Sequence, residues 1–151
     1  TGNGNYRISK YEGGEFSPYK DFTVSSDINA SDYNKLTVRK VGSQVYFFLN
    51  EKLVHSMAFT GFYGNRIGLE AAQAKLHIDY FRVSYLTKNP SSYDFVSYSD
   101  RTNLFYDSFN DNGNEWSTGS DSETNGYVSS ATITGLPLLK NQLGLLAKLL
   151  I

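Results

Sequence analysis

The chain has 151 residues, with 14 Lys and Arg against 15 Asp and Glu, and its formal net charge is −1. A surface this balanced lacks the long-range field that attracts nucleic acid, so we expect no nucleic-acid partner. The absence of cysteine excludes disulfides and thiolate zinc sites, and two histidines are too few for a multi-histidine metal cage. With 12 Tyr, 10 Phe and 13 Gly beside 3 Pro, the composition indicates a β-rich globular protein.

The first 86 residues show short strand patterns separated by turns. We expect strands at 6–11, 22–24, 36–39, 45–49, 53–59, 66–71 and 76–85. Alternation places Leu36 and Val38 on one face, and it places Thr37 and Arg39 on the other. Asn50-Glu51 is predicted to be a two-residue hairpin turn, because Asn tolerates positive φ. The absence of a helical period predicts an antiparallel sandwich or barrel.

Composition divides the rest of the chain into three segments. Residues 87–103 are rich in Ser, Asn, Asp and Tyr and predict a linker, whereas strand patterns resume over 104–131. The tail, 132–151, differs from both, because its last 16 residues hold 8 leucines against 7 in the preceding 135.

Leucines at 139, 143, 146 and 150 predict a short C-terminal helix, although Gly144 weakens that pattern. A shifted reading frame or an incomplete gene end accounts for the tail equally well. Two lysines interrupt this short run, so we expect no transmembrane segment.

The N-terminus carries no recognisable targeting signal. Residues 1–10 are polar and begin in mid-pattern without an initiator Met, so we expect adjoining domains of a longer chain. The lack of cysteine suits a bacterial secreted protein, but cytosolic proteins can lack cysteine too. We expect an extracellular or cell-surface location. Asn29-Ala30-Ser31 is formally a glycosylation acceptor, which has meaning only in a eukaryotic secretory route.

One family resemblance is carried by the segment 77–85, His-Ile-Asp-Tyr-Phe-Arg-Val-Ser-Tyr. It resembles the closing strand of concanavalin A-like lectin/glucanase jelly rolls. Segments 34–40, 46–54 and 66–69 resemble preceding elements of that family in the same order, with Glu51 where Gly is usual. The resemblance, placed over about residues 5–86, implies an all-β antiparallel jelly-roll β-sandwich, incomplete or permuted in this chain.

The segment 105–112, together with Trp116, resembles the opening strand of such a domain but follows the closing strand. Two interpretations stay open. Either 104–131 begins a second copy in a tandem array, or it pairs back and completes the first sheet in permuted order. The second has a physical motive, because an unpaired sheet edge exposes backbone donors and acceptors.

The function that the resemblance favours is a non-catalytic carbohydrate-binding or extracellular scaffold module. Sugar rings stack on aromatic side chains, while their hydroxyls bind amides, carboxylates and Arg. The candidate glycan-binding residues are Tyr63, Asn65, Arg66, Arg39, Tyr46 and Trp116.

The alternative function is a fragment of a glycoside hydrolase or related sugar-processing domain. A retaining hydrolase needs two carboxylates about 5 Å apart. The strand motif Glu-x-Asp-x-x-Glu that supplies them in this superfamily does not occur here. The catalytic strand of a hydrolase would therefore lie outside this chain, and we assign no catalytic residue.

No cofactor is required by the sequence, and structural calcium is the best candidate. Jelly rolls of this superfamily often hold Ca²⁺ near the closing strand, and the resemblance places Asp79 at the matching position. Asp107 and Asp111 supply the oxygen chemistry that calcium prefers. The run 110–115 is more typical of a simple polar turn than of a calcium loop.

Overall fold

The protein is described by a computed structural model that covers residues 4–12, 15–60, 66–69, 77–86, 101–111, 113–114, 117–119, 127–132 and 142–150. Every regular element in these ranges is a β-strand, and all the strand pairs are antiparallel. The expected all-β antiparallel fold class is therefore confirmed. Among the described residues, no helix is long and apolar enough to span a membrane.

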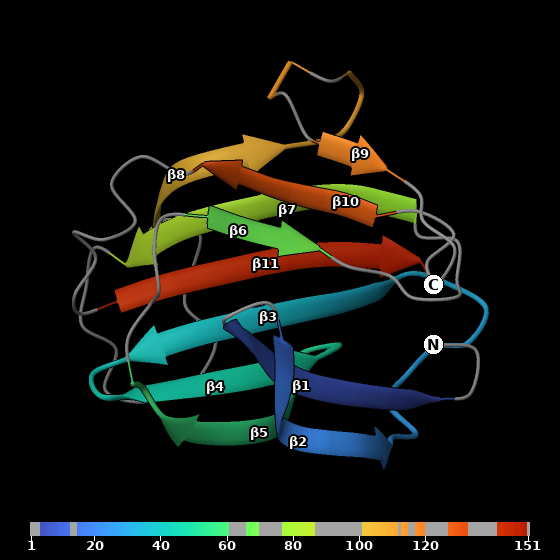
Figure 1. The fold of residues 1–151 in the computed structure, drawn as a ribbon, viewed down its shortest axis with the longest axis vertical. Helices are drawn as coiled ribbons and strands as arrows, with labels where there is room; N and C mark the ends of the chain where they lie inside the picture. Colours follow the sequence, from blue (N-terminus) through green and yellow to red (C-terminus); the bar gives the residue numbers. More distant parts are fainter. Residues whose placement is uncertain are drawn as a thin grey trace.

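The main layer is a six-stranded sheet with the order β5-β4-β3-β11-β7-β8 (Figure 1). Its strands are β3 (Asn34–Val41), β4 (Gln44–Leu49), β5 (Lys52–Ala58), β7 (His77–Leu86), β8 (Arg101–Asp107) and β11 (Gln142–Leu150). The sequence order 3-4-5 follows consecutive hairpins. In contrast, β11 comes from the far end of the chain and lies between β3 and β7.

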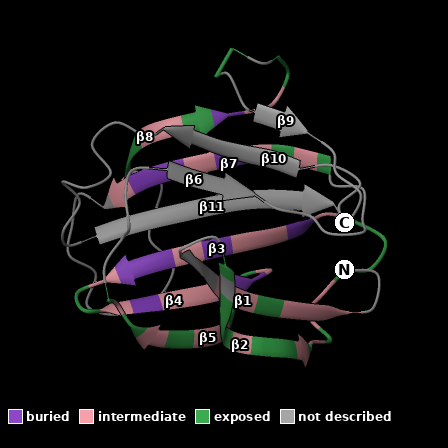
Figure 2. Ribbon diagram, in the orientation of Figure 1, coloured by how far each residue is buried: buried purple, intermediate pink, exposed green. Residues whose placement is uncertain are grey.

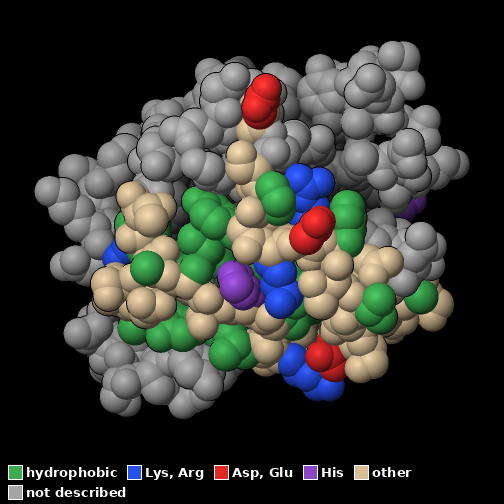
Figure 3. Space-filling view, turned by 60° about the horizontal axis from the view of Figure 1, so that its bottom comes forward, with side chains coloured by type: hydrophobic (Ala, Val, Ile, Leu, Met, Phe, Trp, Pro, Cys, Tyr) green, Lys and Arg blue, Asp and Glu red, His purple; other side chains and the backbone are tan. Residues whose placement is uncertain are grey.

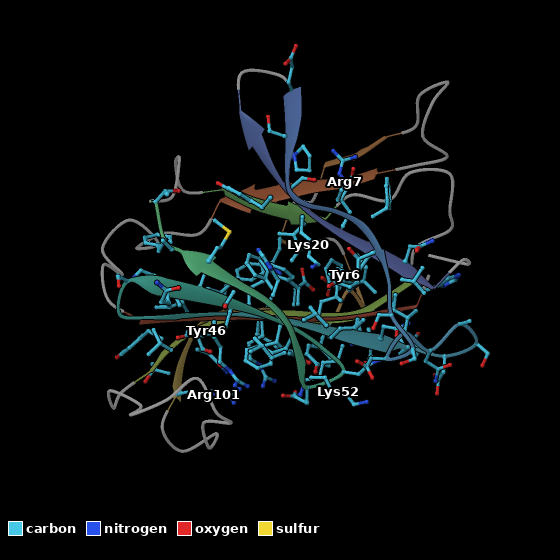
Figure 4. The ribbon with its side chains drawn as sticks, turned by 90° about the horizontal axis from the view of Figure 1, so that it is seen from below. Tyr6, Arg7, Lys20, Tyr46, Lys52 and Arg101 are labelled. Atoms are coloured by element: carbon cyan, nitrogen blue, oxygen red, sulfur yellow. The ribbon has the colours of Figure 1, made fainter. Side chains whose placement is uncertain are left out.

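A second layer lies over one face of this sheet (Figures 1 and 4). It holds two separate small sheets, the hairpin β1-β2 and the three-stranded sheet β6-β10-β9. Their strands are β1 (Asn5–Glu12), β2 (Glu15–Val24), β6 (Arg66–Leu69), β9 (Ser117–Gly119) and β10 (Tyr127–Thr132). The Tyr6 hydroxyl of β1 donates to the Val54 carbonyl of β5 at 3.1 Å, which ties the hairpin to the edge of the main sheet.

The leucine-rich tail is a strand, so the predicted C-terminal helix is wrong for residues 142–150. The register pairs Leu145 with Val38 of β3 and with Val83 of β7. A short apolar run is compatible with either helix or buried strand, because periodicity alone does not separate the two. Pairing on both sides decides for the strand, since it satisfies the backbone donors and acceptors of β3 and β7 together.

The segment after the predicted linker also enters the sheets. Strand β8 begins at Arg101, whereas the linker was expected to run to residue 103. It pairs with β7 at one edge of the six-stranded sheet, and β10 pairs with β6 in the second layer. In this structure, strands from 101–132 therefore add to sheets that hold strands of the first 86 residues.

The alternation predicted for residues 36–39 is confirmed by the register of β3 and β4. Leu36 pairs with Leu49, and Val38 pairs with Phe47. Their parity is opposite to that of Tyr46, which Figure 4 shows on the side away from the second layer, so they lie on the face toward that layer. The buried apolar residues of the described part of the chain include Val45, Leu49, Phe81 and Val83, and the register places them on that face. Figure 2 marks the buried stretches of β3, β4 and β7. Burial of these side chains supplies the hydrophobic contact between the layers.

The predicted turn at Asn50-Glu51 is also confirmed. Strand β4 ends at Leu49 and β5 begins at Lys52, and the two residues between them have φ of 49° and 67°. Positive φ at both central positions belongs to a type I′ turn, whose twist matches the flanking strands. Glu51 has no such tolerance of this region, so its conformation is held by the surrounding structure.

Asn50 fixes this turn through its side chain. Its Oδ1 accepts from the Lys35 amide at 2.8 Å, and its Nδ2 donates to the Asp27 carbonyl at 2.6 Å and to Asn34 Oδ1 at 3.0 Å. The side chain therefore joins three segments, the β2–β3 loop, the start of β3 and the β4–β5 turn.

We predict that Asn50→Ala lowers the free energy of unfolding by about 2–4 kcal/mol, because it loses these bonds and the tolerance of positive φ. Asn50→Gly keeps the backbone freedom and should recover about 1 kcal/mol of that loss. Urea unfolding followed by far-UV circular dichroism measures both. Equal stability of the two variants would contradict the contribution of backbone conformation.

The central position of β11 gives a second prediction. Leu145→Pro removes a ladder donor and distorts a strand that is paired on both sides, so we expect loss of cooperative thermal unfolding. Leu145→Val keeps a strand-forming apolar residue and serves as the matched control. A proline variant that melts like the unmodified protein would show that β11 does not hold the sheet together.

Candidate functional site

The face of the six-stranded sheet that points away from the second layer carries arginine and aromatic side chains. Directly paired residues of neighbouring strands share a face, and Arg39 pairs with Tyr46 while Arg82 pairs with Tyr106. Figure 4 shows Tyr46 on the side of the sheet opposite Tyr6 and Lys20. We call this surface the arginine–aromatic face. Its members are Thr37, Arg39, Tyr46, Phe48, Tyr80, Arg82, Ser84 and Tyr106.

On the β3–β4 half, a buried arginine is held between a ring and a carboxylate. The guanidinium carbon of Arg39 lies 4.6 Å from the centroid of the Phe48 ring, and its Nη2 lies 3.5 Å from Glu51 Oε2. Lys35 forms an ion pair with the same carboxylate. Arg39 is only 5 % exposed, and a charge this buried needs such partners. The turn residue Glu51 therefore supplies one carboxylate to both cations on this half of the face.

On the β7–β8 half, an arginine lies over two tyrosine rings. The Tyr80 and Tyr106 rings are stacked, with centroids 6.4 Å apart and planes inclined by 28°. The Arg82 guanidinium carbon lies 5.7 Å from the Tyr80 centroid and 5.0 Å from that of Tyr106. Both distances lie within the range of cation–π attraction. Tyr106 is 47 % exposed, so one face of this cluster reaches solvent.

The two halves meet at β11. Gly144 is the register partner of Arg39 on one side and of Ser84 on the other. The next register position of β11 on this face is Leu146, which pairs with Thr37 and with Arg82. Close by, the Thr37 hydroxyl is buried and makes no hydrogen bond to any described residue. The centre of the arginine–aromatic face therefore holds buried Thr37 and Ser84 beside the register positions Gly144 and Leu146.

Two of the predicted glycan-binding residues, Arg39 and Tyr46, are brought together as neighbours on this face. Arg66 begins β6 in the second layer, where the structure describes its backbone. Tyr63, Asn65 and Trp116 lie outside the described residues. A sugar-binding role for any of the six stays a prediction.

Sequence reasoning missed Tyr80, Arg82 and Tyr106. The first two lie in the segment used for the family resemblance, and their shared parity was a usable signal. Tyr106 lies on strand β8, where successive side chains point to opposite faces of the sheet. What the sequence does not provide is the pairing of β7 with β8, which places Tyr106 beside Arg82.

The predicted calcium ligands have other roles in the described structure. Asp107 is buried, and its two oxygens accept from the Phe109 amide at 2.7 Å and from Asn114 Nδ2 at 2.8 Å. Asp111 accepts from the Gly113 amide at 2.8 Å, while Asp79 is an exposed residue of β7. Within the described ranges, no three His, Asp or Glu side chains form a group that would hold a metal ion. Calcium binding stays a prediction.

Comparison with known proteins identifies no relative. No family model, no curated protein and no solved structure matches the chain. The function is therefore argued from the geometry of the arginine–aromatic face itself.

Next to Arg39, β3 buries a second cation on the opposite face of the sheet. Lys40 is 3 % exposed, its Nζ donates to the Gly42 carbonyl at 2.8 Å, and the same atom lies 4.8 Å from the Phe59 centroid. Burial lowers the pKa of Lys40 below its ordinary value of 10.5, because desolvation disfavours the charged form.

This shift predicts a pH dependence of stability. Between the lowered pKa of the folded state and 10.5, the unfolded chain binds more protons, so the free energy of unfolding rises with pH. Lys40→Met removes this group, and we expect the stability of the unmodified chain relative to this variant to increase as the pH approaches 10.5. Urea titrations at a series of pH values measure the difference. A constant difference would contradict the burial of the amine.

Proposed function

We propose that this chain is a non-catalytic module that binds carbohydrate on the arginine–aromatic face. The observation that carries the proposal is the cluster of Arg82 with the stacked Tyr80 and Tyr106 rings. The apolar face of a sugar ring packs on an aromatic plane, and its hydroxyls accept hydrogen bonds from a guanidinium beside that plane. The cluster supplies both chemistries at one exposed position.

The cluster is suited to binding because its side chains are held in place before a ligand arrives. Tyr106 projects from β8, the edge strand of the sheet, and contacts Tyr80 and Arg82 on the neighbouring strand. Immobilising a free side chain costs about 0.5–1.5 kcal/mol on binding, and a ring that is already packed avoids part of that cost.

The part of the arginine–aromatic face that is open to a ligand lies at the β8 edge of the sheet. Thr37, Arg39, Phe48 and Ser84 are buried, whereas Tyr106 on the edge strand is 47 % exposed. We therefore expect the site to take a single sugar ring at Tyr106.

The proposal includes a concanavalin A-like jelly-roll architecture. Support for it comes from the sequence resemblance of 34–54 and 77–85 and from the layered antiparallel strands. A fold does not determine a function. The binding proposal therefore depends on the arginine–aromatic face and not on the resemblance to this family.

We predict that Tyr106→Ala and Arg82→Ala each weaken binding of the recognised glycan by about tenfold, which corresponds to about 1.4 kcal/mol. Tyr106→Phe should bind nearly as well as the unmodified chain, because it keeps the ring. A glycan array identifies the ligand, and calorimetry then measures the dissociation constants.

The chain offers a matched control in the second layer. Arg7 lies 5.5 Å from the centroid of the Phe22 ring, which is 66 % exposed, so Phe22→Ala removes a similar pair outside the proposed site. We expect it to leave glycan binding unchanged. An array without any bound glycan would refute the proposal and leave the scaffold role, and release of new reducing ends would favour the hydrolase alternative.

A further inference from the structure

The loop between β2 and β3 presents an acceptor sequence for N-linked glycosylation. Asn29-Ala30-Ser31 is the one Asn-x-Ser/Thr sequence of the chain in which x is not proline. All three residues are exposed. The related sequence Asn89-Pro90-Ser91 is barred by its central proline. The structure therefore places the acceptor sequence where an enzyme can reach it.

The local geometry brings the two functional side chains of this sequence together. Asn29 Oδ1 accepts from the Ser31 amide at 3.1 Å and from the Ser31 hydroxyl at 3.2 Å. This is an Asx turn, in which the side chain takes the place of a backbone carbonyl. Both hydrogen bonds draw the electron density of the side-chain amide toward Oδ1. They engage Oδ1 and not Nδ2, the atom that accepts a sugar, and the Asn29 residue is exposed.

The side chain of buried Asn34 holds the backbone of this loop. Asn34 Oδ1 accepts from the Asn29 amide at 2.8 Å, and Asn34 Nδ2 donates to the Asn29 carbonyl at 2.7 Å. Asn50 then joins Asn34 and Asp27 to the β4–β5 turn. The fold thus holds the main chain of Asn29 through bonds that do not involve its side chain.

We propose that Asn29 accepts an N-linked glycan when the chain enters a eukaryotic secretory route, where an oligosaccharyltransferase transfers it from a polyprenyl-pyrophosphate-linked oligosaccharide. Nδ2 of Asn29 forms a bond to C1 of the first sugar, and the bond from C1 to the pyrophosphate oxygen breaks. Polyprenyl pyrophosphate leaves with the electron pair of that bond, and Nδ2 gives one proton to a base of the transferase. The step is a substitution without oxidation or reduction.

The acceptor is separate from the proposed carbohydrate-binding face. It lies in the loop that precedes β3, at the end of the sheet where the β4–β5 turn also lies (Figure 1). Modification of Asn29 and binding at Tyr106 are therefore independent properties, and each is tested without the other.

The test uses the full chain, secreted from a eukaryotic cell behind a cleavable leader, with intact-mass spectrometry before and after peptide-N-glycosidase treatment. We expect one glycan, which the glycosidase removes while converting Asn29 to aspartate. Asn29→Gln and Ser31→Ala should both abolish the modification, whereas Ser31→Thr should retain it because threonine also supplies the hydroxyl.

A control for the secretory route is available in the same chain. Pro90→Ala turns the barred sequence into an acceptor and should add a second glycan. An unmodified chain that emerges without a glycan, while the Pro90→Ala variant carries one, would overturn the proposal. A glycan that persists in Asn29→Gln would overturn it too.

Discussion

The structure depends on the pairing of β11 between β3 and β7. Without this strand, β5-β4-β3 and β7-β8 have no shared neighbour in the main sheet. Backbone donors and acceptors of two long strands would then lack partners, at a cost for each buried group. The same pairing sets the register across the sheet, because Leu146 aligns with Thr37 on one side and with Arg82 on the other. Both halves of the arginine–aromatic face are therefore joined by one strand.

Polar burial on β3 is the main energetic cost of this arrangement. Arg39 and Lys40 are adjacent in sequence, so the alternation of the strand sends them to opposite faces, and both are buried. Each is compensated in a different way. Arg39 has the Glu51 carboxylate and the Phe48 ring, whereas Lys40 has the Gly42 carbonyl and the Phe59 ring. Burial lowers the pKa of Lys40, because desolvation disfavours its charged form.

What the sequence predicted well is local. The faces of Thr37 and Arg39 follow from a period of two, and the Asn50-Glu51 turn follows from the tolerance of Asn for positive φ. The tail was misread because its leucines fit a helix and a buried strand alike, and only its partners β3 and β7 separate the two. Tyr106 was missed for a similar reason. Its place beside Arg82 depends on a long-range pairing between segments that the sequence separates.

The same chain shows why an exposed ring next to an arginine is not by itself a binding site. Phe22 and Arg7 form such a pair, but they lie on a separate two-stranded hairpin. Hydrophobic side chains alone do not mark a site either, because in the coloured part of Figure 3 they are interspersed with polar ones. Tyr106 differs because the Tyr80 ring stacks on it and Arg82 lies close to both rings, so the three side chains restrain one another. The distinction therefore lies in the second ring, which the pairing of β7 with β8 brings beside Tyr106.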